Sequence, residues 1–273
     1  MALRIPLLIF FFVISVYFSS KIGPRNLIIN KQISNINLSS DLLRIISFGN
    51  KRMFTALIWL KTLLESDHNH YEGERLNNWM YLRFDSITKL DPYFLEAYQF
   101  GGTYLSVIKD DIPGAKTIYD RGLKHYPNDY NLAFNAGFLY YFEIGDVDQG
   151  FKLLSKIQYD KQAPPFLPSL VSRIKAEQGD LANAYLLLKL AYQKNTDPRL
   201  KKRYEQSLYS LKAEIDLNCL NHKDTNKRKY CFEKDFKGNP YLLNDQGLYY
   251  SEISWRPFRP TKKGGKIPPT KND

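Results

Sequence analysis

The sequence predicts an all-α fold, a solenoid of stacked helix pairs, for three reasons. Short motifs recur along the middle of the chain at an offset of 34 or 35 residues. Within each repeat, apolar residues follow the 3.6-residue period of a helix. Gly-Asp and Asp-Pro pairs stand between these segments, and such pairs are typical of helix ends and helix starts. A repeat of this length accommodates two helices and their turns.

Pairs of residues that share one offset define the repeat. Asp111, Asp146 and Asp180 begin three similar segments, which are 35 and 34 residues apart. Gly102 and Gly137 are also 35 residues apart. Independent pairs with a common offset rarely arise by chance, so they indicate one repeated structural unit.

Each repeat contains two amphipathic segments. The first helix has small residues in the middle of its apolar stripe, which allow a neighbouring helix to approach closely. These first stripes are Tyr98, Gly101, Gly102 and Leu105, then Ala133, Ala136, Gly137 and Tyr140. The second stripes are Ala115, Ile118, Tyr119 and Gly122, then Gly150, Leu153, Leu154 and Ile157, then Ala184, Leu187, Leu188 and Ala191.

On these residues the chain resembles the tetratricopeptide repeat (TPR) family, whose unit is W-x2-L-G-x2-Y, then A-x3-F, then a closing Pro. One unit matches with Tyr98, Gly101, Gly102, Leu105, Ala115, Tyr119 and Pro127, and the next with Ala133, Ala136, Gly137, Tyr140, Gly150 and Leu154. The third is degenerate, since Val171 replaces the Gly and three prolines delay its first helix. The resemblance covers residues 91–195 and extends weakly back to about 40. It implies three to four helix pairs; a non-repeating helical bundle is the alternative.

The domain organisation follows from changes in composition. Leu42–Leu64 and Leu76–Leu90 read as a further helix pair, and Leu200–Ile215 as a capping helix. We expect five parts: 1–21 an N-terminal signal or anchor helix, 22–40 a linker, 41–216 the TPR-like solenoid with its capping helix, 217–256 a small Cys-containing hairpin appendage, and 257–273 a basic disordered tail.

The N-terminus carries an apolar run over residues 5–18. As a helix, this run would rise about 21 Å, which is short of the roughly 30 Å hydrocarbon core, but its flanking residues can extend it. It is either a cleaved signal peptide or an uncleaved membrane anchor. Tyr17 and Phe18 put bulk where signal cleavage needs small residues, so we favour the anchor.

The orientation of this anchor has two readings. A short apolar run led by a basic residue, here Arg4, is typical of a secretory signal, and we expect the body on the exported (periplasmic or extracellular) side. The positive-inside rule favours the cytoplasmic side, because Lys21, Arg25 and Lys31 follow the run.

The C-terminal region combines a hairpin signal with excess positive charge. Turn signals at 238–240 and 244–247 frame two short apolar segments, which predicts a hairpin. The residues from Asp235 to Tyr241 are similar to a short stretch near the C-terminal end of type II secretion pseudopilins, although the chain lacks the pseudopilin processing motif. Residues 200–273 hold 16 Lys+Arg and 9 Asp+Glu, which is +7 of the total +11. We favour a solvated tail over one that binds anionic lipid or nucleic acid, and expect no nucleic-acid partner.

Few residues suggest chemistry. If the body is exported, we expect a disulfide between Cys219 and Cys231, and otherwise free thiols. A zinc site at these cysteines and His222 lacks an obvious fourth ligand. The segment 67–72, with His68 and His70, reads as a polar loop rather than a metal site. No common nucleotide-binding or hydrolase motif occurs. We expect a protein that is not an enzyme and has no metal or cofactor.

The resemblance also nominates binding residues, because family members use first-helix side chains that point away from the second helix to line a concave groove. By position these are Glu96, Gln99, Thr103 and Ser106 in one unit, Asn131, Phe134, Phe138 and Tyr141 in the next, and Ser172 and Lys175 in the third. Exposed aromatics in such a groove would suit a peptide or a partner helix. Alternatively, the chain's own terminal segments cover them.

The function that these expectations favour is a membrane-anchored scaffold that binds a protein or peptide partner through its concave groove. A structural assembly or stability factor of an envelope machine, of secretion or pilus type, is the alternative. An enzyme or metal-binding protein is a weaker third reading.

Overall fold

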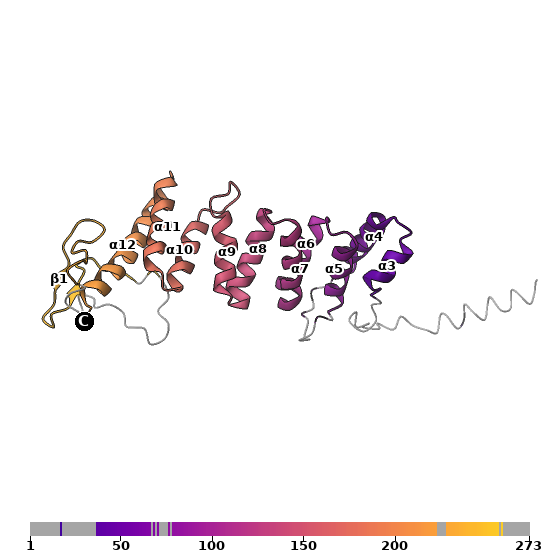
Figure 1. The fold of residues 1–273 in the computed structure, drawn as a ribbon, viewed down its shortest axis with the longest axis horizontal. Helices are drawn as coiled ribbons and strands as arrows, with labels where there is room; N and C mark the ends of the chain where they lie inside the picture. Colours follow the sequence, from indigo (N-terminus) through magenta and orange to yellow (C-terminus); the bar gives the residue numbers. More distant parts are fainter. Residues whose placement is uncertain are drawn as a thin grey trace, which may run out of the picture. The chain divides into compact units, whose positions relative to one another are not determined.

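The computed structural model describes Tyr17 and residues 37–66, 68, 70, 76, 78–222, 228–256 and 258 (Figure 1). Helices dominate these residues, and a single hairpin is the only sheet among them, so the all-α prediction is confirmed. The helices are α3 (Ser40–Ile46), α4 (Lys51–Leu64), α5 (Trp79–Leu90), α6 (Leu95–Thr103), α7 (Ile112–His125), α8 (Tyr130–Phe138), α9 (Val147–Ile157), α10 (Leu167–Glu177), α11 (Leu181–Lys194) and α12 (Pro198–Leu220).

The chain divides into two compact units, residues 1–38 and 39–273. The anchor predicted over 1–21 lies outside the described residues except for Tyr17, as do most of the linker and, apart from Phe258, the basic tail at 257–273. Within the described part of the chain, no helix has both the length and the apolar character needed to cross a membrane.

Repeated aspartates start the second helix of each pair. The side chains of Asp111, Asp146 and Asp180 each accept a hydrogen bond from a backbone N–H three residues later. An aspartate in this position satisfies a backbone donor that has no partner inside the helix. The 35- and 34-residue spacing of these aspartates is therefore a spacing of helix starts.

Repeated close contacts join the two helices of each pair. A Cβ atom added to Gly102 on α6 would run into the ring of Tyr119 on α7, and one added to Gly137 on α8 would run into Leu154 on α9. Both partners in the second contact lie 35 residues after those in the first. A residue without a Cβ is required at these two positions, because a buried side chain fills the space.

The helices of the second unit pack in chain order, as the sequence of colours in Figure 1 shows. Contacts join each helix from α5 to α12 with the next one, and also join α5 with α7 and α6 with α8. The core is correspondingly extended: one cluster surrounds Phe84, Tyr98 and Tyr119, a second surrounds Leu154 and Ile174, and further clusters follow along α11 and α12.

Two π-helical segments end the first helices of successive pairs. These segments are η1 (Tyr104–Ile108) and η2 (Leu139–Ile144), which begin 35 residues apart. After each one, the chain closes with a bond from the backbone N–H of the capping aspartate, Asp111 or Asp146, to a carbonyl six residues earlier. The helical periodicity of the sequence did not predict these two π-helical segments. A π-helical turn differs from an α-helical turn by one residue and has no distinctive composition.

The flanking helices differ in detail from the prediction. Leu42–Leu64 forms two helices, α3 and α4, which are separated by a turn that contains Gly49. The first helix of the third pair begins late, at Leu167, as its prolines predict. The capping helix α12 is longer than expected and runs to Leu220.

The C-terminal appendage packs on α12 within the same compact unit. Its hairpin pairs β1 (Leu242–Leu243) with β2 (Tyr249–Tyr250) in antiparallel register, which confirms the predicted hairpin. Tyr241 packs against Leu217 and Leu220, and its hydroxyl donates to the buried Asp216. Burial raises the pKa of Asp216, although bonds from Lys212 and Tyr241 oppose this rise.

Candidate functional site

A row of aromatic side chains runs along α8 and η2. Tyr130, Phe134, Phe138 and Phe142 follow one another at four-residue intervals, and their successive ring centroids are 5.7, 4.7 and 5.4 Å apart. Residues four apart lie above one another on a helix surface, so this spacing forms a continuous apolar ridge. We call these four residues the aromatic row.

The aromatic row is anchored on one side and open on the other. Phe134 and Phe138 are half-buried against the core of α9 and α10. Phe142 remains 57% exposed, and Phe166, just before α10, packs edge-on against Phe138 while remaining 51% exposed. Isolated exposed aromatics are common, but a contiguous set that is fixed by packing on its inner side offers a binding surface.

A cavity of about 510 Å³ lies beside the aromatic row, between the first helices of two successive pairs. Thr103, Ser106 and Val107 line it from α6 and η1. The three phenylalanines of the aromatic row, Phe134, Phe138 and Phe142, line it from α8 and η2. The exposed carboxylates of Asp110 and Glu143 also line it. This groove therefore combines apolar walls with negative charge.

Two of the polar residues predicted for the groove, Gln99 and Thr103, join helices to one another. Gln99 donates to Asp129 across α6 and α8 at 3.0 Å. The Thr103 hydroxyl lies 2.9 Å from the hydroxyl of Tyr119 and accepts a longer bond from Asn135. These bonds fix the walls of the groove. Of the other polar residues predicted in these two units, Glu96 and Asn131 are exposed, and Ser106 is half-buried with its hydroxyl donating to carbonyls of the preceding turn.

The third pair does not present the predicted residues to an open groove. Ser172 is fully buried, and its hydroxyl donates to the Ala184 carbonyl at 2.7 Å, so placing it in the groove was wrong. The core positions of the earlier pairs are kept in α10, where Leu167, Val171 and Ile174 are buried, and Ser172 is buried in addition by its contact with α11. Lys175 is half-buried, pairs with Asp180 at 3.3 Å, and lies over the ring of Phe151.

Tyr141 connects the groove to α10. It is half-buried, and its hydroxyl donates to the Glu177 carboxylate at 2.8 Å. Burial, followed by the nearby charge of Glu177, raises the pKa of Tyr141 to about 12. Its phenol is therefore neutral at physiological pH and acts as a fixed donor rather than as a titrating group.

Sequence reasoning missed Phe142, Phe166 and Val107. Phe142 continues the four-residue series from Phe134 and Phe138, and that spacing was the available signal. Phe166 and Val107 carried no such signal, because the turn before α10 and the π-helical segment η1 place them.

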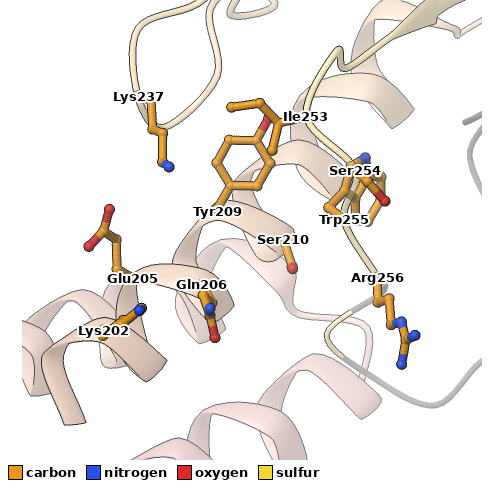
Figure 2. Close-up of a pocket in the computed structure, with 10 residues that line it drawn as sticks. All are labelled: Lys202, Glu205, Gln206, Tyr209, Ser210, Lys237, Ile253, Ser254, Trp255 and Arg256. Carbon is orange, nitrogen blue, oxygen red and sulfur yellow. The ribbon is translucent and has the colours of Figure 1, made fainter. Parts of the chain in front are cut away.

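A second cavity, of about 520 Å³, lies between α12 and the appendage (Figure 2). Lys202, Glu205 and Tyr209 line it from α12, and Lys237 and Arg256 line it from the appendage. Three cations and one carboxylate give this cavity a positive excess. The sequence did not reveal it, since only the packing of the appendage brings these residues together.

Buried hydrogen bonds hold the wall of this second cavity. The Tyr209 hydroxyl donates to Asp235 at 2.9 Å and lies 2.5 Å from the Ser251 hydroxyl. Burial raises the pKa of Tyr209 to about 12. Burial also acts to raise the pKa of Asp235, but hydrogen bonds from Asn239, Tyr209 and Lys237 outweigh it and lower that pKa.

Cys219 and Cys231 form a disulfide, with their Cα atoms 5.7 Å apart. The pairing leaves neither thiolate to bind a metal, so the alternative of a zinc site with His222 fails. Among the residues that the structure describes, no three His, Cys, Asp or Glu side chains gather as metal ligands. The polar segment at 67–72 lies outside these residues except for His68 and His70.

The groove and its aromatic row must therefore be interpreted from their own chemistry. No protein-family model matches the chain, and a comparison with curated proteins finds no match either.

Proposed function

We propose that this protein is a membrane-anchored, TPR-like scaffold that binds an apolar segment of a protein partner in the groove beside the aromatic row. The carrying observation is that Phe142 and Phe166 remain exposed next to a cavity whose walls are fixed by packing and hydrogen bonds. The proposed role is binding, without catalysis and without a cofactor. The body would lie on the exported side of the membrane.

The repeat supports the TPR-like part of this proposal. Capping aspartates and glycine–side-chain contacts recur at the same 35-residue offset, and successive helices contact both the next helix and, in the first pairs, the next but one. Helix-pair repeats that stack in this way bury one continuous core and leave the first helices lining a common face. The groove lies between two such first helices.

The groove also defines the chemistry of its partner. Its apolar wall suits large apolar or aromatic side chains, and Asp110 and Glu143 favour Lys or Arg beside them. Such a pattern occurs on extended peptides and on amphipathic helices, which are the two common occupants of apolar grooves. The partner segment would therefore be both apolar and basic.

The alternative function is a structural assembly factor of an envelope machine, with one permanent partner. The disulfide favours this setting, because disulfides persist in oxidising compartments such as the periplasm. A stoichiometric partner that stays bound through high-salt purification would favour the permanent complex over exchangeable peptide binding.

The proposal is tested by selecting a random-peptide phage library on the purified protein. We expect enrichment of apolar, basic peptides. The affinity of one synthetic selected peptide is then measured for the Phe142→Glu and Leu190→Glu variants. Both positions are exposed apolar residues, but Leu190 lies on α11, away from the groove residues.

The Phe142→Glu variant should bind this peptide with roughly 30-fold lower affinity, because a groove contact is lost. This factor corresponds to about 2 kcal/mol, as for an interface hot spot. The Leu190→Glu variant should bind as the unmodified protein does. A library without enrichment, or equal losses in the two variants, would contradict groove binding.

A further inference from the structure

Helix α4 is apolar on two sides, because Ile58 and Trp59 pack against the core while a second set of large apolar side chains is exposed. Its fully buried residues are the polar Thr55 and Thr62. The large apolar side chains Met53, Leu57, Leu60 and Leu64 are instead between 54% and 78% exposed. A helix on the surface of a globular protein normally buries its apolar stripe and exposes its polar one.

The exposed apolar residues of α4 form one stripe. Met53, Leu57, Leu60 and Leu64 are spaced by four, three and four residues, so at 100° per residue they fall within about 60° of the helix circumference. They are defined here as the α4 stripe. Four large side chains on one narrow face make a contiguous apolar surface rather than scattered exposed residues.

The turn before α4 adds to this exposed apolar surface. Phe48 is 88% exposed and has a φ of 46°, a backbone conformation that is uncommon for a residue other than glycine. Ile45 on α3 is also exposed. The turn therefore presents an aromatic side chain to solvent through a strained backbone, which is a recurring feature of functional segments.

Basic residues flank the α4 stripe on both sides. Arg52 and Lys61 lie about 110° and 70° from its centre, in opposite directions. Both side chains are exposed, Arg52 almost completely, and each makes only a long contact with a carboxylate, 4.0 Å from Arg52 to Asp91 and 3.8 Å from Lys61 to Glu65. Ion pairs of this kind at the surface are weak and can give way to other anions. Residues 40–65 hold four basic and two acidic residues. An apolar stripe between basic flanks is the pattern of a helix that lies in the interface of a membrane with anionic lipids.

The chain also places this helix within reach of a bilayer if the N-terminal run is an anchor. The run ends at Phe18 and α3 begins at Ser40, so 21 residues connect them. Even fully extended, that linker spans at most about 70 Å. Tethering at this range raises the effective concentration of the first helices at the membrane surface, so weak interfacial contacts become sufficient.

We propose that α4 binds the surface of a lipid bilayer, with the α4 stripe at the level of the acyl chains and Arg52 and Lys61 at anionic headgroups. This inference rests on the membrane anchoring in the proposed function. It adds a second membrane contact, which would orient the scaffold instead of leaving it on a free tether.

The test uses the full chain reconstituted in vesicles of phosphatidylcholine and phosphatidylglycerol that contain doxyl-labelled lipid. An environment-sensitive fluorophore is attached to Leu60→Cys, since the native cysteines are paired. Leu190→Cys serves as the matched exposed-leucine control, and Phe12→Cys reports whether the N-terminal run inserts.

We expect a blue shift and lipid quenching at position 60, and neither at position 190. Adding Leu57→Gln and Leu64→Gln should reduce the quenching at position 60 towards the control. Omitting phosphatidylglycerol should reduce it as well, because the basic flanks lose their partners.

Quenching at position 12 without quenching at position 60 would overturn the inference while leaving the anchor intact. A blue shift at position 60 without lipid quenching, with crosslinking between copies at that position, would also overturn it and assign the α4 stripe to a second copy of the chain. Absence of quenching at position 12 would instead count against the anchor of the proposed function.

Discussion

Gly102→Ala changes a single hydrogen into a methyl group at the closest contact between α6 and α7. The new Cβ would overlap the ring of Tyr119, including its Cδ1 atom at 2.7 Å. This ring cannot move aside freely, because it is almost fully buried and its hydroxyl is bonded to Thr103. The substitution therefore forces the two helices apart or strains the ring.

Two opposing effects set the size of this change. Alanine stabilises a helix interior by about 1 kcal/mol relative to glycine. Overpacking a well-filled core costs about 1–3 kcal/mol, and the restrained ring puts Gly102 in the upper part of that range. We therefore expect a net loss of about 1–2 kcal/mol in the free energy of unfolding. For a chain of this size, that lowers Tm by about 2–8 °C.

The assay is urea and thermal unfolding followed by circular dichroism, in a double-mutant cycle with Tyr119→Val. Valine lacks the ring atoms that meet the added Cβ, so Gly102→Ala should become neutral or stabilising in that background. If Gly102→Ala raises Tm in the unmodified protein, or costs the same in both backgrounds, the steric reasoning for the repeated helix contact is wrong.

Three further changes test other parts of the fold. Asp146→Ala removes the N-cap of α9 and should cost about 1 kcal/mol in urea unfolding; an unchanged midpoint would show that the cap does not stabilise the helix. Cys219→Ser opens a loop with a sequence separation of 12 and should cost about 3 kcal/mol, and the variant should lose the sensitivity to reducing agent that the unmodified protein shows. The pKa of Asp235 is lowered in the folded protein, so its ionised form stabilises the fold at pH values above the ordinary pKa of 3.8. This stabilisation is lost as the pH falls through the folded-state pKa. The difference in stability between the unmodified protein and Asp235→Asn should therefore be largest near neutral pH and shrink in acid. A pH-independent difference would argue against stabilisation by the ionised carboxylate.

The repeat offset predicted where the second helix of each pair begins and where helices approach closely. The Asp91-Pro92 pair, which is typical of a helix start, does not begin α6, because that helix begins at Leu95 with Phe94 as its N-cap. Asp111 and Asp146, which were predicted to lie in turns, cap the helices that follow, and Asp197 caps α12 as its Asp-Pro pair predicts. Glycines such as Gly102 are small where a partner side chain needs the space, and this requirement is visible in the sequence as a repeated small residue in an apolar stripe.

The candidate site was harder to predict, because it depends on register and on what remains uncovered. Ser172 was misplaced because its burial depends on its contact with the Ala184 carbonyl of α11, which helical periodicity does not show. Phe142 was missed although its four-residue spacing from Phe138 was visible in the sequence, because the family pattern of groove positions does not include it. The exposure of the α4 stripe could not be predicted, since periodicity shows that a helix has an apolar face but not what covers it.

The central claim, that the aromatic row receives a protein partner, is tested most directly by site-specific photo-crosslinking in intact cells. A photoreactive residue replaces Phe142 in the groove or Leu190 on α11. The account predicts a discrete protein adduct from position 142 that is absent from position 190, and that is lost when Phe166→Glu is added. Identical adduct patterns from both positions, or none from position 142, would contradict it.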